Sequence, residues 1–303
     1  MQCADKKTAS QSVTVEKSYT MSEKVQRTYR YAELTWPEAD EAAKQNKVVV
    51  LPIGSMEQHG PHLPLDYDYY IADRCCLEAG KRSPADILVL PPIPFGYNIQ
   101  GVDFPGTIHV EYNHLLEYCL DVCKSLAYHG FKKILIINGH GSNWPILDLV
   151  ARRVVIETSS YCSVANWFAF GKEAFQKVRE SVYPGGCAHA CEAETSVYLY
   201  LNPELVQMDK AQDYLRENLD KFYQVDLFGG AAKVWYGYWL SSDTPNGCIG
   251  QPTLATADKG RVLFEGAVSG MVEFIRKFRA MDLPQRHDHH SMHKNERKVL
   301  GWP

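Results

Sequence analysis

The side chains of this chain that are best suited to chemistry gather in one short run, residues 54–68. Glu57, His59 and Asp68 lie there among two glycines and two prolines, directly after the apolar run 48–53. Carboxylate oxygen together with imidazole nitrogen is the ligand set that Zn²⁺, Mn²⁺ and Fe²⁺ take in proteins. Glu57 and His59 are two residues apart, so in an extended segment they point to the same side. Asp68 follows far enough along the chain for the loop to fold back and add a third ligand.

Two later segments also carry side chains of the metal-ligand type. His140 follows the apolar run 133–137 in a glycine-rich turn, and His189 precedes Glu192 and Glu194 at the start of a predicted helix. Open parallel α/β sheets carry their sites at the carboxyl ends of the strands, and at least two of the three clusters are expected there. Together the clusters supply about four to six ligands, which is what one or two catalytic metals require.

The segments that must position these clusters alternate between strand and helix patterns. We expect buried strands over 48–53, 86–90, 133–137 and 161–167, with a further short strand over 107–110. We expect helices over 71–81, 112–129, 145–157, 192–201 and 258–279, and an earlier one that follows Thr35 as its N-cap and ends at Gln45. Near-continuous apolar strands between helices predict an α/β fold, a mostly parallel sheet with helices on both faces. The segment 203–250 follows no regular pattern.

Composition favours a soluble globular protein and argues against several other classes. The 303 residues are 45% hydrophobic and 22% charged, and the net charge is −4 without a basic stripe, so we expect no nucleic-acid partner. Nine cysteines show no framework spacing, which favours reduced thiols and a cytoplasmic location. No apolar run reaches membrane-spanning length, so no membrane partner is expected.

The domain organisation that we expect is a single catalytic domain over residues 28–282. Residues 1–27 are polar and predict a disordered extension rather than a signal peptide, and residues 283–303 form a C-terminal tail. The tail contains several histidines, but a polar segment after the last helix is usually solvated. Cys187 and Cys191 flank His189 and are open to two interpretations, zinc ligands or packed thiols, of which we favour packing.

The ligand-bearing motifs also carry a resemblance to a known family. These motifs are the run 57–62 with Asp68, the turn 138–140, and His189 followed by 194–196. In them the chain resembles the creatininase family of metal-dependent amidohydrolases. The similarity extends to 104–107 and 255–260, and covers roughly residues 28–280. It implies a three-layer αβα fold, a hydrolase that uses one or two divalent ions (Zn²⁺, Mn²⁺ or Fe²⁺), and a ring-like homohexamer.

Metal-ligand roles follow from this resemblance and from the residue types. Asp68 is the candidate to bridge two metals, because a carboxylate has two oxygens and spans the ~3.5–4 Å between paired ions. Glu57 and His140 would complete one metal site, and His59 and Glu194 the other. A metal-activated water would then attack the carbonyl of the substrate.

Two further residues are candidates for proton transfer. His189 is expected to carry a proton to the leaving group, because imidazole titrates near neutral pH and the resemblance gives the matching histidine this role. Glu192 is a candidate second base. An equally open alternative is that Glu192 is simply a carboxylate favoured at a helix N-terminus.

Three positions depart from the creatinine-hydrolysing enzyme of this family. Ser142 stands where that enzyme has a glutamate, Gly185 where it has a substrate-covering tryptophan, and Cys191 where the family commonly has glycine. Trp167 matches the other pocket tryptophan of that enzyme, although a core role is equally ordinary for it. Ser142 and Trp167 are our candidate substrate-binding residues, and creatinine is not the substrate that we expect.

The activity that we expect is hydrolysis of a C–N bond in a small polar molecule, such as a cyclic amide, a formamide or a guanidino compound. The main alternative is hydrolysis of a C–C bond in a cyclic diketone sugar such as 3-dehydro-scyllo-inosose. A maturation peptidase is a less favoured alternative. A metal-binding protein without catalysis would instead show a closed ligand set.

Overall fold

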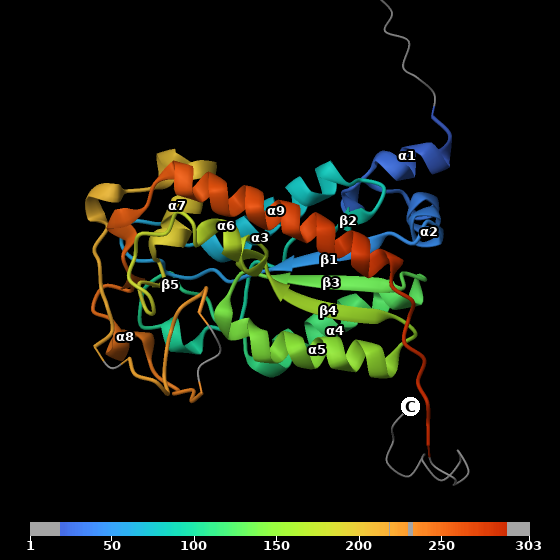
Figure 1. Cartoon of the computed structure of the whole chain (residues 1–303). Coiled ribbons are helices and arrows are strands. Elements are labelled where there is room, and N and C mark those ends of the chain that lie inside the picture. Colours follow the sequence, from blue (N-terminus) through green and yellow to red (C-terminus); the bar gives the residue numbers. More distant parts are fainter. Residues whose placement is uncertain (1–18, 218, 230–232, 290–303) are drawn as a thin grey trace, which may run out of the picture.

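A four-stranded parallel sheet forms the centre of the molecule (Figure 1). The computed structural model describes residues 19–217, 219–229 and 233–289. The strands are β1 (Val48–Ile53), β2 (Ile87–Val89), β3 (Lys133–Asn138) and β4 (Tyr161–Asn166), and their order in the sheet is β2-β1-β3-β4. Each strand lies within one residue, at both ends, of a strand expected from the sequence.

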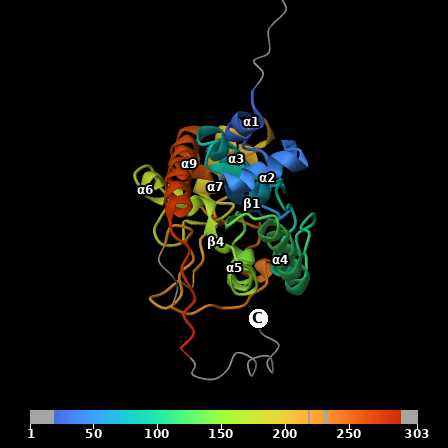
Figure 2. The ribbon, with the colours of Figure 1, turned by 90° about the vertical axis from the view of Figure 1, so that its right-hand side faces the viewer.

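Helices cover both faces of this sheet, as Figures 1 and 2 show. One face carries α3 (Tyr67–Arg82), α6 (Lys172–Phe175), α7 (Glu192–Leu201) and α9 (Ala257–Ala280). The other face carries α2 (Trp36–Lys44), α4 (Tyr112–Tyr128) and α5 (Trp144–Glu157). The expected α/β fold with three layers is therefore confirmed.

Successive residues of β1 enter two separate hydrophobic cores. Val48 and Val50 pack in the core on the side of α3 and α9, whereas Val49, Leu51 and Ile53 pack in the core on the side of α4 and α5. All six residues of β1 are buried, because helices cover both faces of a parallel sheet. This two-sided burial explains why β1 is a continuous apolar run rather than an alternating one.

Helix α3 begins earlier than the sequence suggested, at Tyr67 rather than at residue 71. Its first turn is rich in aromatic residues, which have only a weak helix preference. Tyr67 is 1% exposed and packs in the core, so tertiary burial overrides that preference. As a result Asp68 lies in the first turn of a helix and not in a loop.

A second, two-stranded antiparallel sheet pairs β5 (Cys187–His189) with β6 (Ile249–Gly250) and was not expected. The irregularity expected over 203–250 is otherwise confirmed for its described residues, where the short helix α8 (Leu240–Asp243) and brief 3₁₀ turns are the helical elements. The short strand expected over 107–110 is wrong. Ile108 and His109 form only isolated bridges, to Met56 and Gly96.

The disorder expected over residues 1–27 is wrong for its last part. Met21–Arg27 form helix α1, with a capping box between Thr20 and Glu23. Val25 anchors α1 because its side chain is buried in the core. Residues 1–18 lie outside the described part of the chain.

The described part of the C-terminal tail, residues 283–289, forms neither helix nor strand and is exposed. The rest of the expected tail, residues 290–303, is not among the described residues. Within the described residues, no helix combines the length and the apolar character that a membrane span needs.

Candidate metal centre

The ligand-bearing loops leave the sheet where its strand order reverses. β1 and β3 are neighbours, and their last residues, Ile53 and Asn138, are paired in register. The chain leaves β1 to form β2 on one side and returns to form β3 on the other. Such a reversal opens a crevice at the carboxyl ends of the two strands. Glu57 follows the first of these ends and His140 the second, as the sequence predicted.

Two glycines allow the first turn of α3 to press against both loops. A Cβ atom on Gly54 would lie 2.2 Å from the backbone nitrogen of Tyr69, and one on Gly139 would lie 2.1 Å from the backbone oxygen of Asp68. No side chain fits at either position without a shift of the backbone. The close approach places the Asp68 side chain between the loops that carry Glu57 and His140.

Carboxylates and imidazoles converge in this crevice. His140 Nδ1 lies 2.8 Å from Glu57 Oε2 and 3.0 Å from Asp68 Oδ2, and His59 Nε2 lies 3.3 Å from Asp68 Oδ1. Two groups each bring three potential ligand atoms within 4.8 Å of one another, Glu57–Asp68–His140 and Glu57–His59–His189. Separations of this size suit ligands that share ions at ~2.0–2.2 Å.

Backbone carbonyls orient two of the imidazoles. His140 Nε2 donates to Tyr97 O at 3.1 Å, and His59 Nδ1 donates to Glu57 O at 3.2 Å. These bonds assign the proton to one ring nitrogen and direct the other nitrogen toward the carboxylates. Metal-binding histidines are typically held in this way, so His140 Nδ1 and His59 Nε2 are the nitrogen atoms available to a metal.

Several polar atoms of this cluster are buried without a hydrogen bond. Glu57 Oε2, His59 Nε2 and Asp68 Oδ2 have no hydrogen-bond partner within the described part of the chain, although they lie close to one another. Burial of such atoms without compensation is costly. One or two divalent cations would satisfy these atoms, and oxygen with imidazole nitrogen is the donor set for Zn²⁺, Mn²⁺ or Fe²⁺. These residues therefore fit a metal.

The two carboxylates of the cluster remain ionised. Burial alone would raise the pKa of Asp68, but the adjacent His59 and His140 hold that pKa below its ordinary value. Burial likewise opposes ionisation of Glu57, yet His140 and His189 lower its pKa. The cluster therefore offers two negative charges to a cation.

The imidazoles of the cluster respond differently to burial. Burial would lower the pKa of His59, but Asp68 raises that pKa to about 9. Glu57 and Asp68 likewise outweigh the burial of His140 and raise its pKa. When no metal is bound, protons on His140 Nδ1 and His59 Nε2 can bond to the carboxylates, and a metal that binds must displace these protons. Burial lowers the pKa of His189 to about 4, which leaves its ring neutral at pH 7.

His189 lies inside the cluster, and its nearest polar partner is Gln58. His189 Nε2 is 2.9 Å from Gln58 O, 2.9 Å from Gln58 Nε2 and 3.9 Å from Glu57 Oε1. The Gln58 side chain also donates to Gly247 O at 3.1 Å, so it links the first ligand loop to the segment before β6. Sequence reasoning passed over Gln58, although its place between Glu57 and His59 could have indicated it.

Glu194, an expected metal ligand, also caps the start of α7. Its Oε2 accepts a hydrogen bond from the backbone amide of Cys191 at 3.3 Å, as part of a capping box at the start of α7. Glu194 belongs to neither three-ligand group, although its charge acts on His59. Burial raises the pKa of Glu194 to about 7. The charges of Glu194 and His59 act on each other, and their expected pairing on one ion stays a prediction.

Glu192, a candidate base, has other partners. Its carboxylate is fully buried and receives hydrogen bonds from Lys259 Nζ at 2.6 Å and from the backbone amide of Ser181 at 2.8 Å. Among the described residues, Glu192 belongs to neither of the two groups of potential metal ligands. These contacts favour the alternative that Glu192 is a structural carboxylate at a helix N-terminus.

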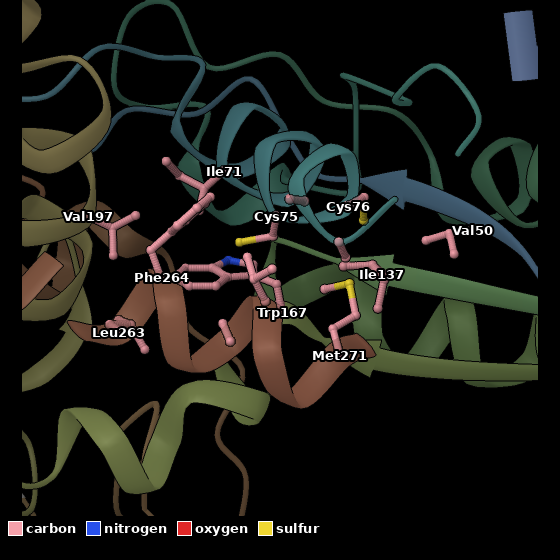
Figure 3. Close-up of a cluster of buried hydrophobic side chains, with 14 of the residues drawn as sticks. Val50, Ile71, Cys75, Cys76, Ile137, Trp167, Val197, Leu263, Phe264 and Met271 are labelled. Atoms are coloured by element: carbon pink, nitrogen blue, oxygen red, sulfur yellow. The ribbon is translucent and has the colours of Figure 1, made fainter. Parts of the chain in front are cut away.

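Trp167, a candidate substrate-binding residue, lies in the hydrophobic core instead. It is 1% exposed, and Figure 3 shows its ring among Ile71, Cys75, Phe264 and Met271. The sequence placed Trp167 correctly at the end of β4. The 3₁₀ turn that begins at this residue directs the ring into the core between α3 and α9, which the sequence pattern did not reveal.

Ser142, the other candidate substrate contact, lies in the 3₁₀ turn just after His140 and accepts a hydrogen bond from Gln100. Ser142 is only partly buried. Ser142 thus follows the ligand candidate His140 by two residues, and its side chain is bound to Gln100. Its contact with substrate remains a prediction.

Cys187 and Cys191 are buried, with their sulfur atoms 3.4 Å apart. Neither belongs to a potential metal group among the described residues, in agreement with the packing interpretation. All cysteines of the described residues are free and buried.

Two buried residues beside the cluster were missed by sequence reasoning. His62 Nε2 lies 2.8 Å from Thr195 Oγ1, which ties the first ligand loop to α7. The ring of Tyr67 lies against that of His59, with centroids 4.7 Å apart. The signal for His62 was its place in the run 57–62, whereas the orientation of Tyr67 depends on the unexpected early start of α3.

Comparison with known proteins agrees with this geometry. Residues 32–275 match the family model Creatininase, described as creatinine amidohydrolase. The mycofactocin precursor peptide peptidase of Mycobacterium ulcerans is 31% identical over 251 residues, which cover 80% of this chain and 86% of that protein. The 3-dehydro-scyllo-inosose hydrolase of Thermotoga maritima is 26% identical, over 83% of this chain and 85% of that protein. The creatinine amidohydrolase of Pseudomonas putida is 28% identical, over 81% and 95%.

Solved structures show the same relationship. A mutant creatininase of Zn–Zn type superimposes with a TM-score of 0.71 at 25% identity, over 84% of this chain and 99% of that chain. A manganese creatininase shares the fold with a TM-score of 0.71 at 24% identity, over 84% of this chain and 100% of that chain. The family model spans most of the sequence, and the residues of the carboxylate–imidazole cluster lie within the matched range. The chain therefore belongs to the creatininase family of hydrolases.

Proposed function

We propose that this hydrolase uses one or two divalent ions to cleave a C–N bond in a small polar amide. The observation that carries the proposal is the convergence of Glu57, Asp68 and His140, with buried oxygen atoms that have no hydrogen-bond partner within the described residues. When bound, such an ion lowers the pKa of a water molecule toward about 7 and polarises a carbonyl. A C–N hydrolase needs both of these effects.

Asp68 supports a site for two ions. Its Oδ1 faces His59 at 3.3 Å and its Oδ2 faces His140 at 3.0 Å. The two oxygens of one carboxylate thus point toward two different imidazoles, as a bridging ligand requires. Zn²⁺, Mn²⁺ and Fe²⁺ are the candidate ions.

His189 is suited to hold and release a proton at Nε2. This atom has a carbonyl oxygen, Gln58 O, and an amide nitrogen, Gln58 Nε2, each at 2.9 Å. With a proton, Nε2 donates to the carbonyl, and without one it accepts from the amide. Both forms of the ring are therefore satisfied, which is useful for a group that passes a proton to a leaving nitrogen.

A second candidate function is hydrolysis of a C–C bond in a cyclic diketone sugar. The observation that favours it is the similarity over 83% of this chain to a 3-dehydro-scyllo-inosose hydrolase. A third candidate is cleavage of a peptide, since another relative is a peptidase. We rank the small amide first because the amidohydrolase and the peptidase among the relatives are both named for cleavage of a C–N bond.

We also propose that the protein is a homo-oligomer, and a hexamer is the form implied by the family resemblance. Trp235, Tyr236 and Trp239 are 73%, 54% and 51% exposed in the single chain. Tyrosine and tryptophan are enriched in subunit interfaces, and exposed aromatic rings near one another suit a contact between copies of this chain.

The test of the proposed function is a metal-controlled activity screen. The purified protein would be stripped with a chelator, reloaded separately with Zn²⁺, Mn²⁺ or Fe²⁺, and assayed on lactams, formamides, short peptides and oxidised inositols. We expect turnover of an amide that is lost on chelation and restored by one of the ions. Turnover of only the oxidised inositol would favour the second candidate, and turnover that survives complete removal of metal would overturn the proposal.

A further inference from the structure

The carboxylate of Glu192 is buried in a polar contact outside the metal cluster. Its side chain is 0% exposed and accepts from Lys259 Nζ at 2.6 Å. Backbone amides of Ser181 at 2.8 Å and Glu180 at 3.1 Å donate to the same carboxylate. Because Glu192 is the first residue of α7, these contacts fix the start of that helix.

Lys259 is the central member of this contact. Its side chain is 9% exposed, and besides Glu192 its ammonium group donates to Leu254 O at 2.7 Å and pairs with Glu180 Oε1 at 3.0 Å. Three acceptors thus match the three N–H groups of the ammonium, and two of them, Glu192 and Glu180, are carboxylates that offset its charge. Lys259 lies in the first turn of α9, so it joins the starts of two helices.

The two helix starts also meet through their backbones. A Cβ atom on Gly260 would lie 1.8 Å from Ser196 O, so a glycine is required for this close approach. Ser196 Oγ in turn accepts from the backbone amide of Thr256 at 3.1 Å. Figure 1 shows the beginning of α9 beside α7. The segment 256–260 and the start of α7 are thus held together by a close backbone contact and a hydrogen bond, which we call the α7–α9 contact.

Residues on both sides of Glu192, and so next to the α7–α9 contact, lie at the metal cluster. His189, which is 3.9 Å from Glu57, lies three residues before Glu192, and Glu194 lies two residues after it. The connecting Ala190 has a φ of 49°, a left-handed conformation that is uncommon for a residue other than glycine. Such a conformation persists only where its surroundings determine it, and the fixed carboxylate of Glu192 is one such determinant.

We propose that Lys259 is a positioning residue of the metal site, which acts through Glu192 to hold the start of α7 and with it His189 and Glu194. The inference rests on the proposed metal site. A buried ion pair is a weak source of stability, because apolar residues of similar size often serve as well. The role that distinguishes this pair is the placement of the residues on either side of Glu192.

The test compares Lys259→Met with Lys133→Met. Lys133 is a matched control, because it is also a buried lysine whose ammonium donates to two backbone carbonyls, Arg279 O at 2.5 Å and Met281 O. It lies at the start of β3, at the opposite end of that strand from His140. Melting temperature, Zn²⁺ and Co²⁺ affinity by chelator competition, and the visible absorption spectrum of the Co²⁺ form would be measured for both variants.

We expect both variants to melt at a lower temperature than the wild type. Only Lys259→Met should weaken metal binding and alter the Co²⁺ spectrum, because it displaces Glu194, the predicted metal ligand next to Glu192. We expect a loss of about 10–100-fold in affinity, as for other residues that orient metal ligands. Lys259→Arg keeps the charge and should restore part of the affinity. If Lys259→Met does not fold, the double variant Lys259→Met with Glu192→Gln removes both charges, leaves no unpaired buried carboxylate, and is read in the same way.

Two results would overturn the inference, and they differ. Wild-type metal affinity and an unchanged Co²⁺ spectrum in Lys259→Met, or in the double variant, would assign the pair a purely structural role. Failure of the wild-type protein itself to bind Zn²⁺ or Co²⁺ would overturn the proposed metal site, and the positioning role with it.

Discussion

The turn between β3 and α5 offers a pair of substitutions that separates the metal site from general stability. Gly139 and Gly141 stand on either side of His140. A Cβ atom on Gly139 would lie 2.1 Å from Asp68 O, whereas one on Gly141 would meet nothing within 4 Å. We therefore predict that Gly139→Ala impairs metal binding and that Gly141→Ala does not.

The expected size of the effect follows from that distance. Real Cβ contacts essentially never fall below 3.0 Å, so Gly139→Ala must separate the turn from the first turn of α3 by roughly 1 Å. Metal–ligand distances tolerate only about 0.2 Å, so Asp68 and His140 could no longer bind the same ion. A displacement of this size costs roughly 10²-fold in activity. Overpacking adds about 1–3 kcal/mol of destabilisation. In domains of about 150–250 residues, each kcal/mol lowers Tm by about 2–4 °C.

The assay needs no knowledge of the substrate. Metal content of the purified variants and Zn²⁺ affinity by chelator competition report on the site, and thermal melting of the metal-free proteins reports on the fold. Wild-type affinity in Gly139→Ala would refute the reasoning, because the loops would then tolerate separation. Equal damage in Gly141→Ala would also refute it, because the effect would then come from the loss of glycine as such.

Three further changes test individual side chains, and one measurement tests assembly. Asp68→Asn should lower metal content and abolish turnover while circular dichroism stays native, since a neutral amide bridges ions poorly; full activity with unchanged metal would remove Asp68 from the site. His189→Ala should keep its metal but lose about 10²–10⁴-fold in kcat, and a parallel fall in metal content would instead make His189 a ligand. Trp167→Phe should lower Tm yet leave KM unchanged because Trp167 is a core residue, and a raised KM would return it to the substrate pocket. Sedimentation at micromolar concentration should show an oligomer, and a monomer would contradict the proposed assembly.

The central sheet and the position of the site could be predicted because they depend on local patterns. β1 and β3 are continuous apolar runs that are long enough to be buried on both faces. Once two such strands are neighbours, the residues that follow them must lie close together, and Glu57 and His140 do so at 2.8 Å. Chain order alone thus leads from the sequence to the convergence of the ligands.

The features that could not be predicted depend on contacts between distant residues. The partner of Glu192 is Lys259, 67 residues later in the chain, and no local pattern distinguishes a carboxylate with such a partner from a free base. The early start of α3 depends on burial of Tyr67 rather than on helix preference. Helix α1 needed its buried Val25, a single apolar residue whose contact with the core lies outside any periodic pattern.

Two imidazoles of the metal cluster, those of His140 and His59, are oriented by the backbone oxygens of Tyr97 and Glu57. A substitution at residue 97 changes the side chain that is presented beside the site but leaves the carbonyl that holds His140 in place. The side chains that line the crevice can thus change in evolution while the orientation of the metal-cluster histidines is retained. This independence is consistent with relatives that are named for hydrolysis of a peptide, an inosose and creatinine.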